Sequence, residues 1–144
     1  MRRAVLDTNV FLRAILNSRS PSGRLLGEFA GDYSLIVSQA LIFEVLKVLS
    51  RPELQAHSPR VARLDYATMM SFFERAELVE PEDIQPVSRD PKDDMLLACA
   101  KAAGADYLVS EDKDLLVLKE YAGTIICRPA AFVAVLEAQR SRPS

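Results

Sequence analysis

The chain has 144 residues, of which 49% are hydrophobic and 26% are charged, and this predicts one soluble globular domain. Its apolar stretches are too short to span a membrane, and Asp7 interrupts the first of them too early for a signal peptide, so we expect a cytoplasmic protein. The formal net charge of −2 argues against broad, non-specific nucleic-acid binding, which usually requires a basic surplus.

The first half of the chain alternates short apolar runs with helix-starting signals. Residues 3–6 predict a strand, and residues 10–16 predict a short helix. Ser20-Pro21 combines a capping residue with proline at the first helical position, which predicts a helix to about residue 30. A strand over 33–37 and a helix from 38 to about 50 follow. Ser58-Pro59 repeats the capping signal and predicts one long helix to about residue 76.

The second half continues the alternation after a proline-rich loop, with a short strand near 78–79. Asp90-Pro91 opens a helix that ends at Gly104. A strand over 105–109, a short helix over 112–118, a strand over 124–127 and a helix from 128 to about 139 follow. Strands alternating with helices predict an α/β fold with a parallel sheet covered on both faces. We expect one domain over residues 1–139 and a frayed tail over 140–144.

Acidic residues follow the predicted strands. Asp7 comes directly after the first strand, and Asp112 follows the strand over 105–109. The carboxyl ends of parallel strands meet at one edge of a sheet, where ligands bind. Asp90 and Asp93 begin the helix that leads into the second of these strands, so they lie near the same edge, whereas Glu44 stands about two turns inside another helix.

Carboxylates gathered at one place repel each other unless cations compensate their charge. Two divalent ions about 4 Å apart would do this and would catalyse phosphodiester hydrolysis. Cys99 and Cys127 are far apart and His57 is the single histidine, so the sequence does not favour zinc. Oxygen ligands favour Mg²⁺ or Mn²⁺.

Each acid also has a purely structural interpretation. Glu44 could pair with Lys47 on the exposed face of an amphipathic helix. Helix capping, the helix dipole and loop solvation explain the other acids without any catalysis: Asp7, Asp90, Asp93, Asp94, Asp112 and Asp114. The argument for a metal site therefore rests on the convergence of the acids on one edge.

Taken together, these motifs resemble those of PIN-domain proteins. The matching segments are, in chain order, Val5-Leu6-Asp7-Thr8-Asn9-Val10, Ser20 to Leu26, Ser38 to Pro52, Asp90 to Asp94, and Ala103 to Leu116. Their order and spacing are similar to those of the subgroup described as toxin components of toxin–antitoxin pairs. The likeness covers about residues 4–132. It implies a three-layer α/β/α sandwich with a mostly parallel central sheet.

The resemblance also implies which residues form the site. The acids that would hold Mg²⁺ or Mn²⁺ and carry catalysis are Asp7, Glu44, Asp93 and Asp112. Asp94 is the alternative to Asp93, because side chains of adjacent helical residues point about 100° apart and only one can face the site. Asn9 and Ser110 match supporting polar positions. Candidate phosphate contacts are Arg13, Arg24, Lys47 and Lys113.

The function implied by the resemblance is that of a ribonuclease toxin that hydrolyses RNA phosphodiester bonds, pairs with a small antitoxin and forms a homodimer. One alternative is a PIN-like fold that binds RNA or protein without cutting. Another is a receiver-like phosphoacceptor domain, although such a domain needs paired acids after the first strand, where Asp7 stands alone. A haloacid-dehalogenase phosphatase would need a second aspartate in place of Asn9.

Overall fold

A six-stranded sheet lies at the centre of the computed structural model, which describes residues 1–142 apart from the side chains of Tyr66 and Thr68. Its strands lie side by side in the order β3 (Glu77–Leu78), β2 (Tyr33–Val37), β1 (Arg2–Leu6), β4 (Tyr107–Val109), β6 (Thr124–Cys127) and β5 (Glu120–Tyr121). Neighbouring strands are parallel, except that β5 pairs antiparallel with β6. The predicted α/β fold with a mostly parallel sheet is confirmed.

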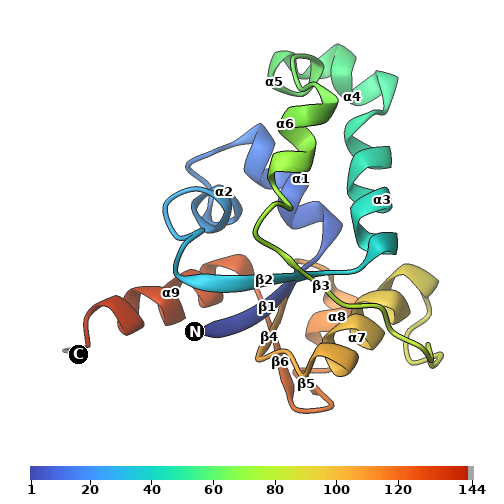
Figure 1. Ribbon diagram of the computed structural model, residues 1–144, viewed down its shortest axis with the longest axis vertical. Helices are drawn as coiled ribbons and strands as arrows, with labels where there is room; N and C mark the ends of the chain where they lie inside the picture. Colours follow the sequence, from blue (N-terminus) through green and yellow to red (C-terminus); the bar gives the residue numbers. More distant parts are fainter. Residues whose placement is uncertain (143–144) are drawn as a thin grey trace.

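Helices cover both faces of the sheet (Figure 1). The first face carries α1 (Thr8–Leu16), α2 (Pro21–Leu26), α3 (Gln39–Leu49) and α9 (Pro129–Arg140), and the second carries α7 (Pro91–Ala103) and α8 (Lys113–Leu116). The connections from β1 to β2 and from β2 to β3 run toward the β3 edge of the sheet. The connection from β3 to β4 runs in the opposite direction, across β2 and β1. Right-handed crossovers therefore place α7 opposite α1 and α3. Every described helix is too short or too polar to cross a membrane.

Apolar side chains from both helical layers meet on the central strands. Ala4, Val5 and Leu6 of β1 are fully buried, as expected for a parallel strand with both faces covered. On the first face, the Phe132 ring of α9 packs against Tyr33 and Tyr107, with ring centroids 5.3 and 5.0 Å apart. These contacts join α9 to β2 and β4.

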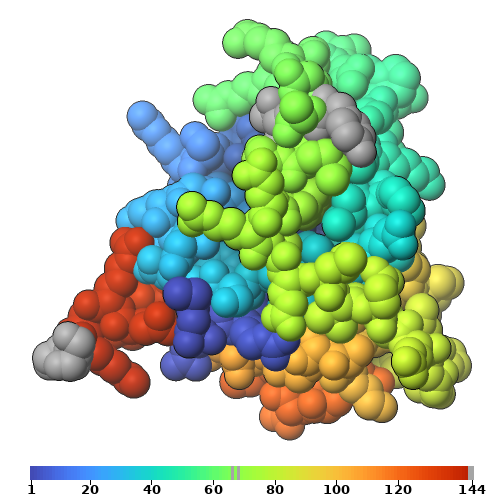
Figure 2. Space-filling view, viewed as in Figure 1, coloured from blue at the N-terminus to red at the C-terminus, as the bar shows by residue number. Residues whose placement is uncertain are grey.

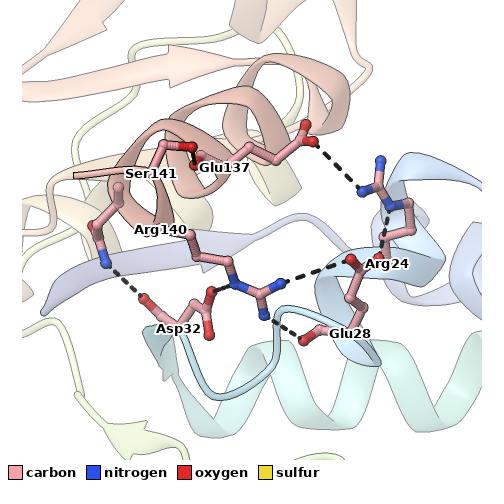
Figure 3. Close-up of polar contacts among 7 residues, drawn as sticks. Arg24, Glu28, Asp32, Glu137, Arg140 and Ser141 are labelled. Carbon is pink, nitrogen blue, oxygen red and sulfur yellow. Dashed lines mark hydrogen bonds and ion pairs between the residues drawn. The ribbon is translucent and has the colours of Figure 1, made fainter. Parts of the chain in front are cut away.

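The end of α9 is also tied to the segment that follows α2 (Figure 3). Arg140 pairs with Glu28 and Asp32, and Arg24 pairs with Glu28. The guanidinium groups of both arginines lie over the buried Phe29 ring, 5.2 Å from its centroid for Arg24 and 4.2 Å for Arg140. The predicted frayed tail covers residues 140–144, but Arg140 is the last residue of α9. Residues 143 and 144 lie outside the described residues.

The predicted long helix over residues 59–76 is wrong. The structure has α4 (Pro52–His57), α5 (Pro59–Ala62) and α6 (Tyr66–Ser71), which extend away from the sheet beyond α1 and α3 (Figure 1). Asp65 lies between the last two, and its carbonyl starts α6 by accepting the Met69 N–H at 3.1 Å. Aspartate favours such helix-starting positions over helix interiors. Helix α2 also ends at Leu26, earlier than predicted, and the short β5 was not predicted.

The chain between β3 and α7 runs back toward the start of α3. In the space-filling view this yellow-green segment lies beside the teal α3 (Figure 2). Glu80 anchors it there, because its Oε1 accepts the Gln39 N–H at 2.8 Å. This path brings the first turn of α7 to the carboxyl edge of the sheet, next to α3.

Candidate metal centre

A cleft of about 270 Å³ opens at the carboxyl edge of the sheet, between α1, α3 and α7. The residues that line it include five acids: Asp7, Glu44, Asp90, Asp93 and Asp112. The four acids predicted to bind metal therefore lie in one cleft. They come from four separate segments of the chain, and the parallel strands bring them together.

Asp7 follows β1 and is fixed by β4. Its N–H donates to the Val109 carbonyl at 3.0 Å, and its Oδ2 accepts the Ser110 hydroxyl at 2.7 Å. Although Asp7 occupies the N-cap position of α1, its side chain makes no capping hydrogen bond. Burial raises the pKa of Asp7, the Ser110 hydroxyl and the backbone N–H of Asn9 oppose this, and the Asp112 charge adds to the rise. The hydrogen bond from Ser110 shows that the Asp7 side chain also has a partner outside α1.

Ser110 connects Asp7 to Asp112. It is fully buried, donates to Asp7, and accepts the Asp112 N–H at 2.9 Å. Asp112 in turn caps α8, where its Oδ1 accepts the Asp114 N–H at 2.9 Å. The strand-end turn after β4 is thus hydrogen-bonded to the strand end of β1. Ser110, which was predicted as a supporting residue, therefore contacts both Asp7 and Asp112.

Asp93 and Asp94 point in different directions. Asp94 Oδ1 accepts the backbone N–H groups of Val87 and Ser88, at 2.9 and 2.6 Å, and does not line the cleft. Asp93 lines the cleft, is only 4% exposed, and accepts the Ser88 hydroxyl at 3.3 Å. Asp90 caps α7 by accepting the Lys92 N–H at 3.0 Å, as its structural interpretation predicted. The geometry therefore favours Asp93 over Asp94 as the acid that could bind a metal.

The carboxylates around Asp93 are crowded. One oxygen from each of Asp93, Asp112 and Asp114 lies within 4.8 Å of the others. The pKa of Asp93 is raised to about 7, first by burial and then by the charges of Asp112 and Asp7. No lysine or arginine among residues 1–142 forms an ion pair with Asp7, Asp93 or Asp112. This oxygen-only donor set with uncompensated charge fits a hard divalent cation.

Asp114 is the acid that sequence reasoning missed, because loop solvation explained it. It stands in the first turn of α8, and its Oδ1 pairs with the Arg89 guanidinium at 2.8 Å. The signal that could have identified it is its position two residues after Asp112, at the end of the same strand. Side chains in such a turn stay close to the strand edge.

Glu44 faces the cleft from α3. The predicted alternative, a surface pair with Lys47, is wrong: Glu44 Oε1 pairs with the Lys92 Nζ of α7 at 2.9 Å, and Lys47 is exposed outside the cleft lining. Periodicity along α3 could not reveal this partner, because Lys92 belongs to another helix.

The structure brings few of the other predicted polar residues into the cleft. Asn9 lines it, but Arg13, Lys47 and Lys113 are exposed and do not. Arg24 lies at the contact between α2 and α9, where it pairs with Glu28 and Glu137. The basic residues that do line the cleft are Arg51 and Lys92, which the sequence analysis did not select.

The strand order separates this fold from receiver-like domains. Here β1 lies between β2 and β4. In the doubly wound order typical of receiver domains, the first strand lies between the second and the third. A receiver-like phosphoacceptor is therefore not supported by the topology.

Comparison with known proteins agrees with this architecture. A family model described as PIN domain matches residues 3–114. The fold is similar to the crystal structure of PAE2754 from Pyrobaculum aerophilum, with a TM-score of 0.55 and 15% identity over 96% of this chain and 98% of that one. It is also similar to VapBC2 from Rickettsia felis bound to a DNA fragment from their promoter, with a TM-score of 0.56 and 15% identity over 88% and 98%. No curated protein matches the chain in sequence.

Proposed function

Because this chain belongs to the PIN-domain family, we propose that it is a ribonuclease that uses Mg²⁺ or Mn²⁺ to hydrolyse RNA phosphodiester bonds. The observation that carries the proposal is the group of carboxylates at the carboxyl edge of the sheet, of which Asp7, Asp93 and Asp112 have no ion-pair partner among the described residues. A purely structural role would leave this concentration of charge unexplained.

Asp7, Asp93 and Asp112 would hold the cation, with Glu44 completing the set. A divalent cation at this place would supply positive charge to the phosphate and activate water. Ser110 fixes the Asp7 carboxylate through its hydroxyl, and the Asp114 N–H fixes Asp112. Both acids are thereby held before any ligand arrives, which lowers the cost of binding one.

We further propose that the chain is the toxin of a toxin–antitoxin pair, acts in the cytoplasm as a homodimer and is controlled by a small antitoxin protein. The sequence likeness to toxin components supports this role, as does the similarity of fold to VapBC2. A PIN-fold domain that binds RNA or protein without cutting is the alternative to test.

The decisive experiment compares the wild-type protein with Asp7→Asn on a panel of single-stranded and structured RNAs, with Mg²⁺, Mn²⁺ or a chelator. Asparagine keeps an oxygen that can accept the Ser110 hydroxyl, so the fold is retained. We expect metal-dependent cleavage by the wild type and a loss of about 100-fold or more in the variant.

The matched control is Glu111→Gln, which removes a neighbouring exposed carboxylate that pairs with Arg128 outside the cleft. Its cleavage rate should stay close to that of the wild type. Equal cleavage by Asp7→Asn and the wild type would contradict the proposed function. RNA binding without cleavage by the wild type would favour the non-cutting alternative.

A further inference from the structure

Lys92 is a cation placed among the acids of the cleft. Its Nζ lies 2.9 Å from Glu44 Oε1, and it lines the cleft together with Asp93. It is also the second residue of α7, where the positive end of the helix dipole disfavours a cation. The start of α7 therefore does not stabilise the Lys92 charge. The carboxylate of Glu44, on α3, stabilises it instead.

The ion pair between Lys92 and Glu44 is easily exchanged. The Lys92 side chain is 58% exposed, and pairs with such exposure contribute little to stability. A divalent cation at Glu44 would repel the ammonium group and so weaken its pair with the carboxylate. Arg89 pairs with Asp114, but its side chain is 87% exposed and does not line the cleft.

We propose that Lys92 neutralises Glu44 in the metal-free protein, leaves it when a divalent cation binds, and then holds an RNA phosphate beside the metal. This inference rests on the proposed function and extends it to a substrate-binding residue. The four-carbon side chain of lysine can swing while its backbone stays fixed in α7. Because Lys92 and Asp93 line the same cleft, a phosphate that Lys92 binds would lie near the cation.

The first test measures metal binding without RNA. Mn²⁺ is titrated calorimetrically into the wild type, Lys92→Gln, and the matched control Lys47→Gln, which removes an exposed lysine of α3 outside the cleft. We expect Lys92→Gln to bind Mn²⁺ about fivefold more tightly, since the competing cation is gone, and Lys47→Gln to change the affinity by less than about twofold. The gain should disappear when Glu44→Gln is present as well.

An unchanged Mn²⁺ affinity in Lys92→Gln would overturn the proposal. An equal gain in Lys47→Gln would also overturn it, because the effect would then reflect net charge alone. This titration needs no RNA and no cleavage. It therefore distinguishes failure of the exchange from failure of the proposed ribonuclease activity.

The second test measures binding of a short single-stranded RNA by fluorescence anisotropy in Ca²⁺, which takes the same oxygen ligands, with intact RNA verified on a gel. We expect Lys92→Gln to weaken binding about fivefold and to lower the slope of log affinity against log salt by about one. Without a divalent ion the variant and the wild type should bind alike, because Glu44 then holds Lys92. Equal weakening with and without metal, or no weakening at all, would overturn the phosphate role.

Discussion

Asp93 and Asp94 are adjacent carboxylates with different surroundings. Asp93 is crowded by other acids, and burial and those charges hold its pKa near 7. Asp94 instead accepts two backbone N–H groups from the loop before α7. A carboxylate that accepts N–H groups stabilises the loop, whereas one surrounded by carboxylates destabilises the fold until a cation arrives.

Replacing each of the two with alanine should therefore have opposite effects. We expect Asp94→Ala to lower the free energy of unfolding by about 1–3 kcal/mol, because the Val87 and Ser88 N–H groups lose their acceptor, and to keep metal binding. Asp93→Ala should lose metal binding without loss of metal-free stability. Urea unfolding and Mn²⁺ titration measure both quantities. Loss of Mn²⁺ binding in Asp94→Ala with unchanged stability would reverse the assignment.

Whether the position of a site residue could be predicted depended on which residues contact its side chain. Asp7 and Asp112 could be predicted because a strand end fixes where each side chain lies. The choice of Asp93 over Asp94 came from the family resemblance and not from local sequence, because the loop at residues 87–88 binds Asp94. The Lys92 partner of Glu44 was not predicted. Sequence periodicity describes one helix at a time, whereas these contacts join separate elements.

Secondary-structure elements were predictable where the local signal was strong. The bounds of β2 and β6 agree with their apolar runs, and α7 begins after Asp90 and ends at Gly104 in a left-handed conformation, with φ +62°. The division of residues 59–76 was not predictable, because two short helices, α5 and α6, share the apolar pattern of one long helix.

Helix α2 approaches the preceding turn closely at Gly23, and this contact predicts how a substitution there changes stability. A Cβ atom on Gly23 would lie 2.5 Å from the Ser18 backbone, whereas one on Gly31 would meet no atom within 4 Å. Gly23→Ala should therefore lower the free energy of unfolding by about 2–3 kcal/mol, because backbone must shift to admit the methyl group. Gly31→Ala should change it by less than about 0.5 kcal/mol. Urea unfolding of both proteins tests the contact, and equal stabilities would contradict it.

Across the whole molecule, the uncompensated acids make metal-free stability depend on pH. The pKa of Asp93 is raised from 3.8 to about 7 in the folded protein. The unfolded chain therefore loses this proton first, so the free energy of unfolding falls as pH rises from about 4 to about 7. Below that range both states are protonated, and the penalty is absent. A rise of about three pKa units sets an upper limit of about 4 kcal/mol, and we expect a loss of a few kcal/mol in a chelator.

Unfolding in urea on both sides of this pH range, with chelator or with Mg²⁺, measures the effect. Mg²⁺ should stabilise the protein more at the higher pH, since it binds the ionised acids of the folded state. Asp93→Asn should flatten the dependence on pH. A metal-free protein that gains stability as pH rises through this range would contradict the assignment of Asp93.

At this largest scale, the fold class and the edge of the sheet that carries the acids were predictable from strands alternating with helices. The strand order was not. Insertion of β4 beside β1, rather than beside β3, depends on which faces the crossover helices can cover. Local sequence does not encode such long-range pairing.

That pairing has a consequence for synthesis of the protein. The Ser110 hydroxyl reaches Asp7 across 103 positions of the chain, so Asp7 has neither Ser110 nor Asp112 beside it until β4 has left the ribosome and joined β1. A nascent or prematurely terminated chain would carry Asp7 and Glu44 without the rest of the centre. The proposed metal centre would thus stay incomplete until β4 has been synthesised and has paired with β1.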